Sequence, residues 1–136
     1  MTDIAKDTVA PAGLGRLAAA FRCSLSGFRH AARHEAAFRQ ELLAAAVLFA
    51  PAILLPVGRL ERLVLVLSML FVIAVELLNS AIEATVDRIS TERHPLSGIA
   101  KDLGSAAVAV ALVMSLLCWI VIAGPPLVGL LAHAAH

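Results

Sequence analysis

The sequence has few charged and few aromatic residues. Only 15% of its 136 residues are charged and 4% are aromatic, with no tyrosine and one tryptophan, whereas 60% are hydrophobic. An ordinary soluble domain is about 25% charged and about 45–50% apolar. This composition excludes a soluble domain and a disordered chain. The formal net charge of +1 gives no basic character, and no nucleic-acid partner is expected.

Several common signals are absent. The two cysteines, Cys23 and Cys118, are far apart, and the second lies deep in an apolar run, so neither a disulfide framework nor a zinc site is expected. The N-terminus has no short apolar core followed by a cleavage site, and no removable signal peptide is expected. The G-x-x-x-x-G-K-[ST] loop and the H-R-D and D-F-G motifs of soluble kinases are missing, which argues against a soluble-type nucleotide site.

Three long apolar runs dominate the chain. A membrane-spanning helix needs about 20 residues, and prolines are tolerated within it where neighbouring groups satisfy the freed carbonyls. The runs predict spans over about residues 38–58, 63–84 and 103–123, joined by a short turn at 58–62 and a charged connector at 87–102. We expect Gly124-Pro125-Pro126 to end the third helix, with residues 124–136 as a C-terminal tail.

The N-terminal part has a different pattern. Residues 1–12 are expected to form a flexible tail, and residues 13–34 carry apolar side chains at helical spacing with arginines largely off that stripe. A basic amphipathic helix of this kind is typical of a membrane interface. A soluble helix packed on a core is the alternative, but this chain offers no soluble core. The predicted fold is therefore an all-α membrane protein with one interfacial helix and three transmembrane helices.

The distribution of basic residues predicts the orientation. Of the 11 lysines and arginines, Arg59 and Arg62 lie in the first turn, and the other nine lie on the side that holds the N-terminus and the connector. The positive-inside rule places that side in the cytoplasm and the C-terminus outside.

A polar stripe ends the second span. Glu76, Asn79, Ser80, Glu83 and Asp87 are spaced by three and four residues, which places them on one helical face. An ionisable residue in a membrane segment costs at least a few kcal/mol and usually faces a protein interior or a wet cavity. We therefore treat this stripe as a candidate site.

The topology brings carboxylates and Lys101 to the same level of the bilayer. Magnesium prefers oxygen ligands and is often held by one or two carboxylates and substrate phosphates. A nearby lysine would complete a phosphate clamp. Glu76 is the deepest acid and fits a base that takes a proton from an alcohol, whereas Glu83, nearer the water, fits the metal.

Other interpretations remain open. Glu76 and Glu83 would also suit simple hydrogen bonds between helices, and Lys101-Asp102 an ordinary polar helix start. The arginines would suit anionic lipid, which we prefer for Arg22 and Arg29. A small cation- or proton-coupled transporter would also use a membrane glutamate, but it gives no role to Lys101 and Asp102.

Three stretches resemble the signatures of the bacterial integral-membrane diacylglycerol kinases. They are Glu35-Ala-Ala-Phe-Arg-Gln-Glu41, Glu76-Leu-Leu-Asn-Ser-Ala-Ile-Glu-Ala-Thr-Val-Asp-Arg88 and Ala100-Lys-Asp-Leu-Gly-Ser-Ala-Ala107, in that order. The resemblance covers roughly residues 14–123. It implies a homotrimer in the bacterial cytoplasmic membrane, with sites shared between subunits on the cytoplasmic side. The implied reaction transfers the γ-phosphoryl group of ATP to diacylglycerol and gives phosphatidic acid.

The resemblance also implies residue roles. Glu76 would be the catalytic base, and Glu35 and Glu83 would hold Mg²⁺ bridging the ATP phosphates. The implied nucleotide-binding residues are Arg16, Cys23, Ser24, Glu35, Glu83, Glu92, His94, Lys101 and Asp102. The implied lipid-binding residues are Arg16, Gln40, Glu41, Glu76, Asn79 and Ser105.

Two points limit the resemblance. Cys23 stands where the best-known member of the family has a tyrosine near the adenine, and a thiol offers less stacking surface. Related members phosphorylate undecaprenol, and the motif residues do not separate the two acceptors, so an undecaprenol kinase is the alternative.

Overall fold

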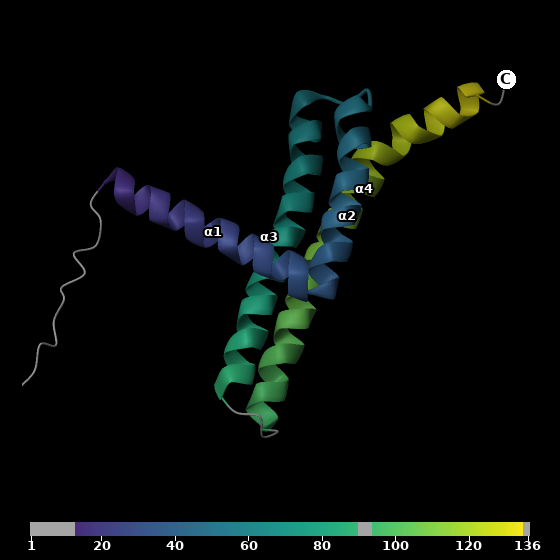
Figure 1. The fold of residues 1–136 in the computed structure, drawn as a ribbon. Coiled ribbons are helices and arrows are strands. Elements are labelled where there is room, and N and C mark those ends of the chain that lie inside the picture. The colour runs from purple at the N-terminus through teal and green to yellow at the C-terminus, as the bar shows by residue number, and fades with distance from the viewer. Residues whose placement is uncertain (1–12, 90–93, 135–136) are drawn as a thin grey trace, which may run out of the picture. The chain divides into compact units, whose positions relative to one another are not determined.

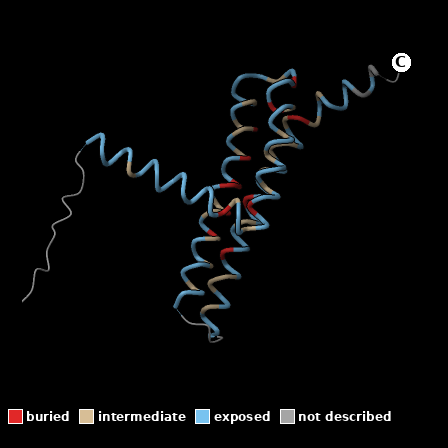
Figure 2. Tube along the Cα trace, viewed as in Figure 1, coloured by how far each residue is buried: buried red, intermediate tan, exposed pale blue. Residues whose placement is uncertain are grey.

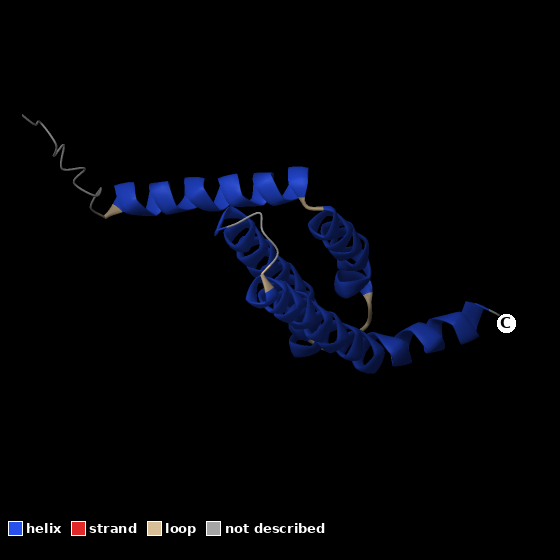
Figure 3. Ribbon diagram, turned by 90° about the horizontal axis from the view of Figure 1, so that it is seen from below, coloured by secondary structure: helices blue, strands red, loops and turns tan. Residues whose placement is uncertain are grey.

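The computed structural model describes residues 13–89 and 94–134, and within these residues every secondary-structure element is a helix. The helices are α1 (Leu14–His34), α2 (Ala36–Leu54), α3 (Arg59–Ile89) and α4 (Pro95–Ala134), shown in Figure 1 and, by element type, in Figure 3. The last three are long and apolar enough to cross a membrane. The prediction of an all-helical membrane protein with three apolar spans is confirmed.

The chain divides into two compact units after His34. The first unit contains α1, which covers almost the whole predicted amphipathic segment. It begins after Gly13, whose φ of 63° is the left-handed conformation that glycine adopts readily, and whose carbonyl accepts from the Arg16 and Leu17 N–H groups. The predicted tail at residues 1–12 lies outside the described residues.

The second unit contains α2, α3 and α4, with α3 packed against both of the others. The turn from α2 to α3 is held by local hydrogen bonds. Glu61 Oε2 accepts from the Gly58 N–H at 2.7 Å, and the Arg62 guanidinium donates to the Leu55 carbonyl at 3.2 Å. A carboxylate in the first turn thus satisfies one of the N–H groups that every helix start leaves unpaired.

The core of this unit is thin. Ala52, Leu65 and Met69 form its central cluster, against which Trp119 packs. Most other apolar side chains are exposed in the single chain, for example Leu43 at 66% and Val121 at 69%. Figure 2 shows few buried positions along the trace. Soluble proteins rarely expose apolar surface on this scale, so lipid or further protein must cover it.

The helices extend further than the apolar runs. α3 continues to Ile89 rather than ending at residue 84, and α4 begins at Pro95, so most of the predicted 87–102 connector is helical. The physical reason is that backbone hydrogen bonds continue through polar residues once a helix leaves the apolar region. The bounds of an apolar run therefore predict the membrane segment, but they do not predict where the helix ends.

The predicted end of the third span at Gly124-Pro125-Pro126 is wrong. α4 runs through both prolines to Ala134. Proline removes the N–H that would bond to the carbonyl four residues back, and its ring crowds that carbonyl, which bends a helix without always ending it. Figure 1 shows α4 changing direction in this part, before it reaches the C-terminus.

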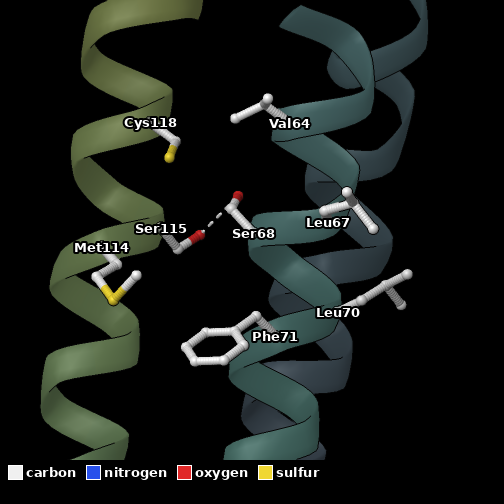
Figure 4. A pocket seen from close by; sticks show the side chains of 8 residues that line it. All are labelled: Val64, Leu67, Ser68, Leu70, Phe71, Met114, Ser115 and Cys118. Atoms are coloured by element: carbon white, nitrogen blue, oxygen red, sulfur yellow. Dashed lines mark hydrogen bonds between the residues drawn. The ribbon is translucent and has the colours of Figure 1, made fainter. Parts of the chain in front are cut away.

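An apolar pocket lies between α3 and α4, away from the polar stripe. Figure 4 shows it, with Val64, Phe71 and Cys118 among the side chains that line it. The Ser115 hydroxyl donates to the Ser68 hydroxyl at 3.2 Å across this space, and the Ser68 hydroxyl donates to the Leu65 carbonyl at 2.8 Å. The two serines therefore join the helices by a hydrogen bond inside an otherwise apolar contact, as expected for helices that pack within lipid.

Candidate active site

One polar cavity of about 270 Å³ opens between the helices of the second unit. Its walls come from the start of α2, the middle of α3 and the first third of α4. The lining residues are Glu35, Ala37, Glu76, Asn79, Glu83, Ser105 and Val108. Five of these seven are residues that the sequence motifs predicted for the site, so the structure brings them together within one chain.

Glu35 reaches the cavity from the start of α2. It is the N-cap residue of this helix, with φ −98° and ψ 117°, and its side chain makes no capping hydrogen bond. A carboxylate at this position normally accepts from an N–H of the first helical turn. Since Glu35 lines the cavity instead, its carboxylate shares that space with the acids of α3.

The α3 wall carries Glu76, Asn79 and Glu83, which helical spacing places on one face. Glu76 is only 3% exposed, and Asn79 is also buried. Asn79 Nδ2 donates to Glu83 Oε1 at 3.2 Å, while Asn79 Oδ1 is buried with no hydrogen-bond partner in the described part of the chain. The Asn79 amide therefore donates a hydrogen bond to Glu83 through its nitrogen, while its oxygen remains an unused acceptor.

The α4 wall contributes Ser105, and one turn earlier lies Lys101. The Lys101 ammonium pairs with Asp87 Oδ1 at 2.5 Å, which ties the start of α4 to the end of α3. Asp102 is exposed and does not line the cavity. Asp87 was expected on the polar stripe, but its pairing with Lys101 was not predicted. The signal for that pairing was their common level next to the connector.

Gln40 and Glu41 do not line the acid cavity. Gln40 is exposed on α2. Glu41 lines a separate space of about 90 Å³ with apolar residues of all three helices, and its Oε2 is buried with no hydrogen-bond partner among the described residues. Neither of these two predicted lipid-binding residues therefore lines the cavity of Glu76 and Ser105, although the Glu41 carboxylate is close enough to Glu76 for the two charges to interact.

The remaining predicted residues lie elsewhere. Arg16, Cys23 and Ser24 are exposed on α1, in the other unit, and the Ser24 hydroxyl donates to the Ala20 carbonyl at 3.1 Å. His94 stands before α4, where its Nδ1 accepts from the Leu96 N–H at 3.2 Å. Glu92 lies outside the described residues.

The donor set of the cavity suits a hard cation. Glu35, Glu76 and Glu83 present carboxylate oxygens, and Ser105 adds a hydroxyl. Among residues 13–89 and 94–134, no three acidic, histidine or cysteine side chains close around a single point as a ready metal cage. Mg²⁺ does not need such a cage, because it retains waters and takes phosphate oxygens alongside one or two carboxylates. The residues therefore fit Mg²⁺ bound together with a phosphate.

A comparison with known families decides the classification. The model of the prokaryotic diacylglycerol kinase family matches residues 22–123, which include the whole cavity. This chain belongs to that family. The family predicted from the three sequence motifs is therefore confirmed.

Curated diacylglycerol kinases of several bacteria are similar to this family member over most of its length. The enzyme of Pseudomonas aeruginosa is 55% identical over 107 residues, which are 79% of this chain and 87% of the relative. The enzyme of Escherichia coli is 46% identical over 110 residues, or 81% of this chain and 90% of the relative. The enzyme of Haemophilus influenzae is 45% identical over 107 residues, which are 79% of this chain and 91% of the relative.

Proposed function

We propose that this chain is an ATP-dependent diacylglycerol kinase that transfers the γ-phosphoryl group of ATP to the free hydroxyl of diacylglycerol. The products are phosphatidic acid and ADP. The observation that carries the proposal is the convergence of Glu35, Glu76 and Glu83 on one cavity between apolar helices. A lipid alcohol held in the bilayer and a polar triphosphate both have access to a site of this kind.

Glu76 is the proposed catalytic base. It is the most buried of the three acids and lies deepest in the apolar part of α3. Its carboxylate accepts the proton of the lipid hydroxyl while that oxygen bonds to the γ-phosphorus. The bond from this phosphorus to the oxygen shared with the β-phosphate breaks, and ADP leaves. General base catalysis of this type contributes about 10²–10⁴-fold to a rate.

The other charged residues serve the phosphates. Glu35 and Glu83 are the proposed ligands of Mg²⁺, which supplies positive charge to the phosphate oxygens when it is bound. Lys101 lies one helical turn from Ser105 and pairs with Asp87. We propose that its ammonium neutralises phosphate charge, with the adjacent Asp102 on the nucleotide. Phosphoryl transfer depends mainly on such positioning and charge stabilisation.

The family resemblance supports the remaining roles. Nucleotide contacts are proposed for Arg16, Cys23, Ser24, Glu92 and His94, and lipid contacts for Arg16, Gln40, Glu41, Asn79 and Ser105. Because Gln40 and Glu41 do not line the acid cavity, they suit the glycerol backbone or acyl chains better than the reacting hydroxyl.

The proposed setting is the bacterial cytoplasmic membrane. Nine of the 11 basic residues favour a cytoplasmic N-terminus and active site. α1 suits the membrane interface because its leucines and phenylalanines share one stripe, away from most of its arginines. The exposed apolar surface of α2, α3 and α4 leaves room for a homotrimer with sites shared between subunits, which native mass spectrometry from detergent or lipid nanodiscs would test.

A panel of lipid acceptors tests the proposal. The purified protein is reconstituted in vesicles with Mg²⁺ and radiolabelled ATP, and with diacylglycerol, undecaprenol or no added acceptor. We expect labelled phosphatidic acid and little labelled undecaprenyl phosphate. Labelling of undecaprenol alone would reassign the acceptor. Ion flux without ATP, combined with no labelling, would favour a transporter and refute the proposal.

A further inference from the structure

α4 approaches α3 closely at Gly104, which is buried beside the acid cavity. A Cβ atom added at Gly104 would overlap Asn79 Oδ1 and would lie 3.3 Å from Asn79 Cγ. The other glycines of α4, at positions 98, 124 and 129, have no described residue within 4 Å of such an atom. A side chain at Gly104 would therefore displace one specific group, and this group belongs to a residue of the site.

The carboxamide of Asn79 links Gly104 to Glu83. Its oxygen occupies the space beside Gly104, and its nitrogen donates to Glu83 Oε1 at 3.2 Å. The two atoms belong to one planar group, so a change that displaces the oxygen also moves the nitrogen. Rotation of the amide by half a turn gives no relief, because it would aim the carbonyl oxygen at the Glu83 carboxylate.

We propose that Gly104 is a positioning residue for the metal site. By leaving space for the Asn79 carbonyl, it holds the amide in the orientation that donates to Glu83 and so fixes this carboxylate for a divalent cation. The inference rests on the proposed function, in which Glu83 is a ligand of Mg²⁺. Residues that orient a metal ligand by a hydrogen bond typically change metal affinity by about 10–100-fold when they are removed.

Four variants test the proposal, namely Gly104→Ala, Gly98→Ala, Asn79→Ala and the double variant Asn79→Ala/Gly104→Ala. Gly98→Ala is the matched control, because it makes the same change in the same helix at a position where the new methyl group meets no described residue. Binding of Mn²⁺ is followed by electron paramagnetic resonance of the free ion, with a non-hydrolysable ATP analogue and the protein in vesicles. Steady-state phosphorylation of diacylglycerol is measured in parallel.

We expect Gly104→Ala to weaken Mn²⁺ binding by about 10–100-fold, with the KM for diacylglycerol little changed. Gly98→Ala should bind Mn²⁺ like the wild type. The double variant should bind it no more weakly than Asn79→Ala, because the added methyl group no longer meets an amide. Unchanged Mn²⁺ binding in folded Gly104→Ala, or a further loss in the double variant, would overturn the proposal.

Two further outcomes separate the positioning role of Gly104 from a role in folding and from the choice of lipid acceptor. If Gly104→Ala fails to fold, the double variant should fold as well as Asn79→Ala, and its failure would show that the contact that matters is not with Asn79. If the wild type binds Mn²⁺ in a Gly104-dependent manner but does not phosphorylate diacylglycerol, the acceptor assignment is wrong and the positioning role stands. If the wild type and Gly104→Ala both phosphorylate diacylglycerol normally, the positioning role of Gly104 is refuted and the proposed function stands.

Discussion

Replacement of Glu76 by glutamine isolates the proposed base. Glutamine has nearly the same volume as glutamate and keeps one carbonyl oxygen, so it fits a site in which Glu76 is 3% exposed. The substitution removes the ability to accept the proton of the lipid hydroxyl. We expect kcat to fall by about 10²–10⁴-fold, the usual contribution of a general base. At about 1.36 kcal/mol per tenfold change, this corresponds to about 2.7–5.4 kcal/mol of transition-state stabilisation.

The assay measures phosphatidic acid formation in vesicles together with binding of an ATP analogue and helix content by circular dichroism. Binding and helix content should match the wild type, because neither depends on the charge of Glu76 in this scheme. Glu61→Gln is the control, since it changes an exposed glutamate of the same helix and keeps an acceptor for the Gly58 N–H. Full activity in Glu76→Gln would refute the reasoning, as would an equal loss in Glu61→Gln.

Three other predictions follow from the same structure. Leu65→Ala removes a side chain with 0% exposure from the core cluster and should destabilise the protein by about 2–5 kcal/mol. Leu67→Ala, whose side chain is 51% exposed, should destabilise it by about 0.5 kcal/mol or less. Thermal unfolding in detergent measures both effects. Asp87→Asn breaks an exposed ion pair and should change the free energy of unfolding by at most about 1 kcal/mol. Lys101→Met should lower kcat by about 10²–10³-fold, because it removes the positive charge that neutralises the phosphates. A kcat of Lys101→Met comparable to that of the wild type would contradict the proposed role of Lys101 at the phosphates. Chelation of divalent cations should abolish phosphorylation without changing helix content, and added Mg²⁺ should restore it; activity that survives complete chelation would exclude a role for the metal.

The number and order of the helices could be predicted from the sequence because they depend on the length of the apolar runs. Their ends could not. α3 continues to Ile89 through residues that are polar but still suited to a helix, and α4 continues through two prolines. Both results depend on backbone hydrogen bonding and local geometry, to which a hydrophobicity pattern is insensitive.

The candidate site was predictable in part. Glu76, Asn79 and Glu83 share a face because of helical spacing alone, and the structure places them on one cavity. Whether Glu41 lines that cavity depends on how α2 packs against α3 and α4, which one sequence does not specify. The roles of Gly104 and Asp87 were missed for the same reason. Each acts through a residue on another helix, and nothing in its own neighbourhood in the sequence indicates the partner.

The bend in α4 has a practical consequence. The segment match with the family ends at residue 123, where Ala123 is buried, and Pro125 and Pro126 follow. Beyond them, Leu127, Val128 and Leu130 are exposed and add nothing to the described core. A fluorescent or affinity label on this terminal portion of the helix would therefore displace no residue of the described core cluster.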